Sequence, residues 1–334
     1  MPIENYSGKK VKPEAFRTLR LTGLLATGRC DTTLGVVSPL VRSPAMKFPV
    51  SAALVLLFGL SAFAQPAPTP AAPFPVSIQV DAAKPVGELK PIWRFFGADE
   101  PNYAYMKDGK KLLGELGELR PDEMYFRAHN LLNTGDGTPA YKWGSTNVYT
   151  EDAAGRPIYD WTIVDRIFDT YRARGVRPYA QIGFMPEAMS TQPKPYQHEW
   201  RPGTGTGNIG AGWGYPPKDY AKWGELVYQW VKHCVERYGR AEVEKWYWEV
   251  WNEPNGASYW HGTVEEFCKL HDYAIAGVKR ALPTARVGGP DVAGAGGKFM
   301  EDFLAHVARG TNYATGEKGT PTDFVAFHAK GSPS

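Results

Sequence analysis

From Met124 onward, short apolar runs alternate with stretches in which apolar residues recur every three or four positions. The short runs have the length and composition of buried strands. They lie at 124–130, 175–184, 245–251, 285–290 and 322–328. The stretches between them have the period of amphipathic helices. They begin after Asp160 and at Asp219, Val264 and Lys298. This alternation predicts an α/β fold with parallel strands.

Polar side chains gather where the predicted strands end. These residues are Arg127, His129, Glu187, Asn252, Glu253, Asp291 and His328. A (β/α)₈ TIM barrel builds its active site at this rim, so the pattern favours a barrel. The competing arrangement is a doubly wound sheet, which usually has a glycine-rich turn after its first strand. The early segment 95–102, FFGADEPN, does not supply such a turn.

The first 75 residues differ from the rest. Met46 and Lys47 open a basic start, an apolar run follows, and Ala62 and Ala64 have the spacing of a signal-peptidase site. We therefore expect a signal peptide over Met46–Ala64, with residues 1–45 a misassigned start, and a secreted or periplasmic protein. The alternative is a genuine N-terminal extension with an uncleaved anchor. Residues 65–75 are rich in Pro and predict an extended linker. The barrel would then occupy residues 76–334.

Composition narrows the set of partners. The net charge is only +3, which argues against nucleic acid or an acidic membrane as a partner. Eleven Trp residues fit either a large core or a groove that stacks flat ligands. The seven His are scattered and no H-E-x-x-H motif occurs, so we expect no metal and no cofactor. Cys234 and Cys268 lie on predicted helices, and a disulfide or two buried thiols both fit.

The stretch WYWEVWNEPNG, residues 246–256, places Glu253 at the end of a strand. A carboxyl group that loses water there has a raised pKa, as an acid catalyst at neutral pH requires. Asn252 can donate a hydrogen bond to a substrate hydroxyl, and the nearby Trp260 can offer a flat surface to a sugar ring. The alternative is a strand end with a solvated Glu.

This stretch resembles the acid/base strand of the glycosidase clan built on (β/α)₈ barrels, in which Asn-Glu ends the fourth strand. Within that clan the chain is most similar to glycoside hydrolase family 39, the β-xylosidase and α-L-iduronidase family. FRAHN at 126–130 resembles the family's R-x-H-G segment. The segments 155–186, WEVWNEPN and RVGGP follow in the family's order. The resemblance covers about 95–328.

The resemblance implies a retaining mechanism in which Glu253 is the acid/base. The nucleophile would be a second carboxylate on the seventh strand, ~5–5.5 Å from Glu253. Counting FFGADEP at 95–101 as the first strand makes the strand before Glu253 the fourth and 322–328 the sixth. The chain would then hold about six of eight βα units, and the nucleophile would lie beyond Ser334. His129 and His328 would bind sugar, and Glu187 would line the rim. Arg127 would pair with Glu249 on the inner face.

Two positions depart from the family's pattern. Its sixth strand carries His-x-Tyr, whereas this chain reads His328-Ala329-Lys330, and Asn130 stands in place of a Gly. The sequence predicts a glycoside hydrolase acting on a β-linked xyloside or polysaccharide. Its expected partner is an oligo- or polysaccharide substrate, and we expect no membrane association after signal cleavage. The alternatives are an endo-β-glycanase on the same barrel and a non-catalytic sugar-binding barrel, which Lys330 would favour. The oligomeric state stays open.

Overall fold

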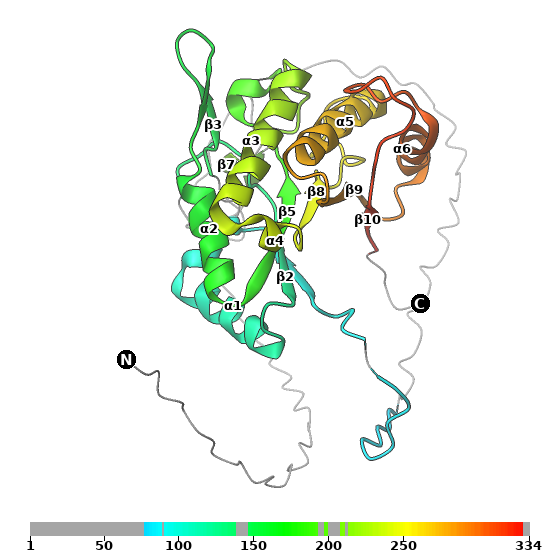
Figure 1. Ribbon diagram of the computed structural model, residues 1–334. Coiled ribbons are helices and arrows are strands. Elements are labelled where there is room, and N and C mark those ends of the chain that lie inside the picture. Colours follow the sequence, from blue (N-terminus) through cyan, green and yellow to red (C-terminus); the bar gives the residue numbers. More distant parts are fainter. Residues whose placement is uncertain are drawn as a thin grey trace, which may run out of the picture. The chain divides into compact units, whose positions relative to one another are not determined.

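A computed structural model describes residues 77–88, 90–137, 146–192, 197–199, 208–210 and 213–329 (Figure 1). The predicted signal peptide, the linker 65–75 and Lys330 lie outside the described residues. By its contacts the chain divides into two units, Met1–Val80 and Asp81–Ser334. The described residues of the first unit, 77–80, form no helix or strand, so the following concerns the second unit. Among the helices that the structure describes, none is long and apolar enough to cross a membrane.

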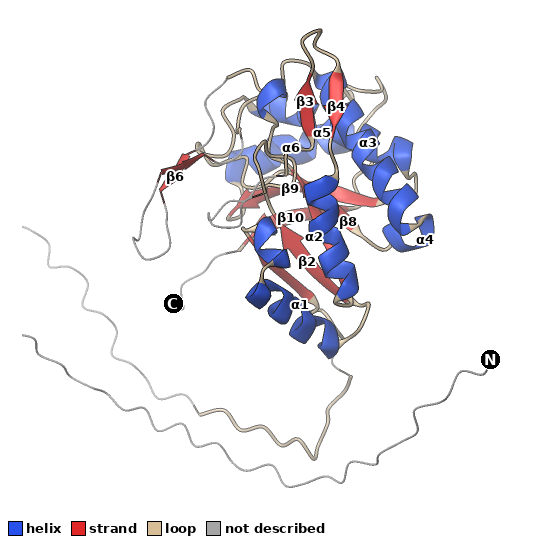
Figure 2. Ribbon diagram, turned by 90° about the vertical axis from the view of Figure 1, so that its left-hand side faces the viewer, coloured by secondary structure: helices blue, strands red, loops and turns tan. Residues whose placement is uncertain are grey.

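A sheet of six parallel strands forms the centre of the second unit (Figures 1 and 2). The strands are β1 (Phe95–Ala98), β2 (Met124–Ala128), β5 (Val176–Ile182), β8 (Tyr247–Val250), β9 (Arg286–Ala293) and β10 (Phe324–His328). Their order in the sheet is their order in the chain. A doubly wound sheet would reverse direction at a switch point. The sheet is therefore an arc of six βα units of a (β/α)₈ barrel, which confirms the predicted fold class.

Helices cover the outer face of this arc (Figure 2). They are α1 (Lys107–Leu119), α2 (Thr162–Ala173), α3 (Tyr220–Tyr238), α4 (Arg240–Val243), α5 (Val264–Ala281) and α6 (Gly297–Arg309), with the 3₁₀ turns η1 (Pro101–Tyr105) and η2 (Glu187–Met189). Two hairpins, β3 (Tyr149–Glu151) with β4 (Pro157–Tyr159) and β6 (Gln197–Glu199) with β7 (Asn208–Gly210), were not expected from the sequence pattern.

Local chemistry explains where two of the helices begin. The Asp219 carboxylate accepts from the backbone N–H groups of Ala221 and Lys222 at the start of α3. Thr263 and Glu266 form a reciprocal capping box at the start of α5. Both devices satisfy amide groups that have no partner within the helix. The predicted starts of these two helices, at Asp219 and Val264, are confirmed to within one residue because these signals are local.

Glycine allows the two central helices to approach closely. A Cβ atom on Gly277 of α5 would lie 2.5 Å from the carbonyl oxygen of Gly224 on α3. Behind this contact, the core between the helices and the sheet is built from large aromatic side chains. Those that are fully buried include Trp223, Trp230, Trp246, Trp248 and Trp251. Most of the tryptophan in the chain therefore supports the barrel rather than a ligand groove.

The inner face of the arc changes character along the strands. Near the amino ends, aromatic rings pack against one another at centroid distances of 5.0 to 6.3 Å. These rings belong to Phe95, Tyr125, Tyr179, Tyr247 and Phe324. In the next layer of inward side chains, toward the carboxyl ends, Arg127 on β2 contacts Glu249 on β8 across the intervening strand β5. The apolar layer thus supports a polar layer at the carboxyl ends.

Candidate active site

A pocket of about 400 Å³ opens at the carboxyl ends of the strands. Its lining comes from β1, β2, β10 and the segment after β8. The residues are Gly97, Ala98, Asp99, Arg127, His129, Asn252, Glu253, Tyr259, His328 and Ala329. Five of the residues that the sequence singled out therefore meet in one place, although up to 201 positions separate them in the chain, from Arg127 to His328.

A left-handed turn aims Glu253 into this pocket. If side chains kept alternating between the two faces of the sheet after Glu249, Trp251 would lie on the inner face. Instead Trp251 has a φ of 74° and packs against Trp223 of α3, so that Asn252 and Glu253 reach the pocket. Glu253 itself has a φ of 48°. Such conformations are costly for residues other than Gly and persist where the surroundings enforce them.

Hydrogen bonds hold this turn in place. The Glu253 N–H donates to the Asp291 carbonyl oxygen at 2.7 Å, and the Gly256 N–H donates to the Glu253 carbonyl oxygen at 2.8 Å. The indole N–H of Trp251 donates to the Tyr259 carbonyl oxygen at 3.0 Å. Glu253 thus stands between an Asn and a Pro because the chain reverses there, and the reversal presents the carboxylate to the pocket.

His328 lies between two carboxylates. Its Nδ1 is 2.6 Å from Glu253 Oε1, and its Nε2 is 3.0 Å from Asp291 Oδ2. The hydrogen bond to Asp291 raises the pKa of His328; Glu253 adds to this, and burial opposes it. An imidazole that serves two acceptors with both nitrogens is the imidazolium form. The carboxylate of Glu253 therefore faces a cation.

Arg127 joins the remaining polar groups of the site. Its Nε pairs with Glu249, and its Nη2 donates to Asn252 Oδ1 at 3.2 Å and to Asp291 Oδ2 at 2.5 Å. Nη1 contacts His129 Nε2. A guanidinium nitrogen can only donate, so His129 Nε2 is the acceptor in this contact. The predicted pair of Arg127 with Glu249 is present.

Glu249 is the most deeply buried carboxylate of the site. Only 1% of its side chain is exposed, and the Tyr179 hydroxyl donates to its Oε1 at 2.8 Å. Burial raises the pKa of Glu249, while the Arg127 guanidinium and the Tyr179 hydroxyl act in the opposite direction. The pair therefore depends on both partners being present, since either charge alone would be buried without compensation.

Two predicted site residues lie elsewhere. Trp260 is 4% exposed, packs against Trp251 and Phe267, and donates its indole N–H to the Thr263 carbonyl oxygen, so the structure places it in the core. Glu187 begins η2 and lines a separate pocket of about 440 Å³. Tyr259 is the aromatic side chain that lines the pocket of Glu253.

Sequence reasoning overlooked Asp99 and Tyr259. Asp99 follows the last residue of β1, and its Oδ1 is 3.7 Å from His129 Nε2. The position of Asp99 directly after the first strand is the sequence signal that points to it. No sequence pattern marks Tyr259, because the turn after Glu253 decides where it lies.

The structure decides between the two alternatives for the cysteines. Cys234 and Cys268 are both buried free thiols, and burial raises the pKa of each. Within the described ranges, no group of three or more His, Cys, Asp or Glu side chains is arranged to hold a metal ion.

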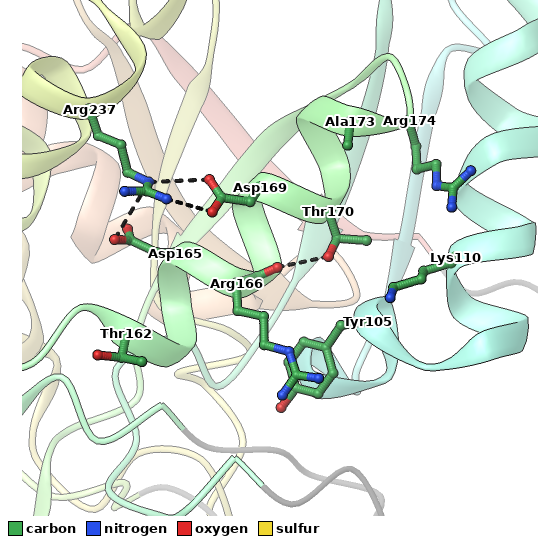
Figure 3. A pocket seen from close by; sticks show the side chains of 10 residues that line it. All are labelled: Tyr105, Lys110, Thr162, Asp165, Arg166, Asp169, Thr170, Ala173, Arg174 and Arg237. Atoms are coloured by element: carbon green, nitrogen blue, oxygen red, sulfur yellow. Dashed lines mark hydrogen bonds and ion pairs between the residues drawn. The ribbon is translucent and has the colours of Figure 1, made fainter.

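A larger pocket of about 640 Å³ lies on the outer surface between η1, α1, α2 and α3 (Figure 3). Half of its charged side chains pair with one another. Arg237 pairs with Asp165 and Asp169, and Arg166 lies 3.8 Å above the Tyr105 ring. None of its lining residues belongs to a strand end. The smaller pocket at the rim is therefore the candidate active site.

An arc of (β/α)₈ units whose fourth parallel strand leads into Asn252-Glu253 defines the class of the (β/α)₈ glycosidases. The chain belongs to glycosyl hydrolases family 39, whose family model matches residues 76–334. This confirms the family that the motifs indicated.

Known relatives agree with this assignment. A β-xylosidase of Geobacillus stearothermophilus is 36% identical over 250 residues, which are 72% of this chain and 43% of the relative. Mouse (Mus musculus) α-L-iduronidase is 25% identical over 287 residues, 80% of this chain and 39% of the relative. The crystal structure of the GH39 enzyme from Xanthomonas axonopodis pv. citri matches with a TM-score of 0.56 at 30% identity, over 70% of this chain and 40% of that one. The chain thus spans less than half the length of these proteins.

Proposed function

We propose that this protein is a retaining glycoside hydrolase that cleaves β-linked glycosides, with Glu253 as its acid/base. The observation that carries the proposal is the placement of Glu253 in a polar pocket at the barrel rim, beside Asn252 and His328. Arg127 Nη2 donates to the side-chain oxygen Oδ1 of Asn252, which leaves the side-chain NH₂ group of Asn252 to donate to a sugar hydroxyl. Family membership and the β-xylosidase relative support a carbohydrate substrate, such as a xyloside or a polysaccharide.

The mechanism needs a second carboxylate at ~5–5.5 Å from Glu253. In the family this nucleophile stands on the seventh strand, and the described sheet has six. Asp291 is poorly suited to the role, because it is 3% exposed and already binds Arg127 and His328. We therefore propose that the nucleophile is a carboxylate outside the six described strands of the sheet.

Proton NMR of the first product tests the proposal. We expect hydrolysis of aryl β-xylosides or related β-glycosides by the full protein, with the β-anomer of the sugar appearing first. Initial appearance of the α-anomer would show inversion and contradict the assigned roles. Saturable sugar binding without hydrolysis of any glycoside would favour the non-catalytic sugar-binding barrel instead.

We also propose that the protein is exported through the signal peptide Met46–Ala64. The basic start, the apolar run and the small residues at 62 and 64 support this. Mass spectrometry of the protein from the expressing cell should then find a mature N-terminus at Gln65. A mature chain that begins near residue 1 would contradict the export proposal and leave the enzymatic one untouched.

A further inference from the structure

Asp291 occupies an irregular position in the sheet. Ala326 of β10 pairs with Pro290 of β9, and Phe327 pairs with Val292, so Asp291 is the extra residue of a β-bulge. Its φ is 59°, and it is 3% exposed. Bulges next to active sites re-aim a side chain, and here the bulge turns a carboxylate onto the polar inner face.

Two routes connect Asp291 to Glu253. Directly, the Asp291 carbonyl oxygen accepts from the Glu253 N–H at 2.7 Å. Indirectly, Asp291 Oδ2 is 3.0 Å from His328 Nε2, and the opposite nitrogen of that ring is 2.6 Å from Glu253 Oε1. The residue therefore holds both the backbone of the proposed acid/base and the ring that contacts its carboxylate.

We propose that Asp291 is a positioning residue for Glu253. The Asp291 carboxylate fixes the His328 ring and keeps both ring nitrogens protonated, so that Nδ1–H donates to Glu253. The meaning of this role for catalysis rests on the proposed glycosidase function. A buried carboxylate that orients a histidine toward a third reacting group is a recurrent arrangement, because it selects one tautomer and one ring orientation.

The charges around His328 favour the protonated ring. Glu253, from the segment after β8, and Asp291, from β9, are anions in direct contact with it. Arg127, from β2, is the opposing cation: its Nη2 donates to the same Asp291 oxygen, and its charge acts to lower the pKa of His328. The pKa of His328 is raised, with the hydrogen bond to Asp291 as the largest cause. The negative charge of Asp291 should thus help the His328 ring to keep both of its nitrogens protonated as the pH rises.

Asp291→Asn tests this role, because Asn keeps the size and one acceptor oxygen but removes the charge. Histidine labelled with ¹³C and ¹⁵N reports the titration of His328 by NMR in the full chain, with His328→Gln to identify its signal. We expect the pKa of His328 to lie above 6.5 in the unaltered protein and to fall in Asp291→Asn, because the hydrogen bond to the Asp291 carboxylate is the largest cause of its rise. Asp291→Glu, which keeps the charge, should restore most of the shift.

The chain offers a matched control. Asp272 on α5 is fully buried and its Oδ2 lies 2.9 Å from His306 Nε2, so it forms the same kind of pair away from the pocket. Asp272→Asn should leave the titration of His328 in place. A His328 pKa at or below 6.5 in the unaltered protein would overturn the proposal even if Asp291→Asn did not fold. An unchanged His328 pKa in a folded Asp291→Asn would do the same.

A second readout separates this inference from the proposed function. If the protein hydrolyses glycosides, the basic limb of its kcat/KM profile should move to lower pH in Asp291→Asn and stay in place in Asp272→Asn. A shift of the NMR titration without any shift of this limb would overturn the positioning role. If no variant hydrolyses any glycoside, the proposed function fails, and the His328 titration alone decides whether Asp291 controls that ring.

Discussion

Glu253→Gln should lower kcat by ~10²–10⁴-fold on glycosides with poor leaving groups, in which the departing oxygen needs a proton. The substitution keeps an acceptor oxygen for His328 and fits the same left-handed turn, so the loss reports chemistry rather than folding. Steady-state hydrolysis of alkyl and aryl glycosides of the same sugar by the full protein measures it.

Glu253→Gln should slow the hydrolysis of the two types of substrate to different extents, which is expected only if Glu253 is the acid/base. An activated aryl leaving group needs no proton, so its departure should be affected far less, and the glycosyl-enzyme should accumulate because no base activates water. Azide should restore turnover, since it attacks without a base. Glu301→Gln, the same change at an exposed position of α6, is the control and should retain full activity. Equal loss on both substrates without azide rescue would remove Glu253 from the role.

Arg127→Met should reduce the free energy of unfolding by about 3–5 kcal/mol, because it leaves buried carboxylates without their cation. Arg127 contacts both Glu249 and Asp291, whose side chains are 1% and 4% exposed. Urea unfolding monitored by tryptophan fluorescence measures the change. Arg309→Met, at an exposed position of α6, is the control and should cost less than about 0.5 kcal/mol.

A second substitution identifies the cause of this loss. Adding Glu249→Gln to Arg127→Met removes one uncompensated charge, so the double variant should be more stable than Arg127→Met alone. The loss in Arg127→Met should also shrink as the pH falls. Without the guanidinium, Glu249 binds a proton more tightly in the folded than in the unfolded state, and stability then rises as pH decreases. If Arg127→Met lost no more free energy of unfolding than Arg309→Met at any pH, the ion pair of Arg127 and Glu249 would not stabilise the site.

The sequence predicted the elements of the barrel well because their signals are local. The period of the hydrophobic residues distinguishes strand from helix, and the starts of α3 and α5 follow from short-range capping by Asp219 and Thr263. The end of β9 was less predictable. The pattern ended that strand at Pro290, whereas the strand continues to Ala293, since pairing with β10 through a bulge extends it beyond the local pattern.

The sequence by itself determined the family, the order of the strands and the position of Glu253 at the end of the fourth, because each of these is written in a continuous run of residues. Only the tertiary structure decided which rim residues meet. Trp260 went to the core and Glu187 to another pocket, since both lie several residues beyond a strand, where the course of the chain and not the strand pattern decides the surroundings of a side chain. Asp291 joined Arg127, His328 and Glu253 because a bulge in β9 and parallel pairing brought together strands that are far apart in the chain.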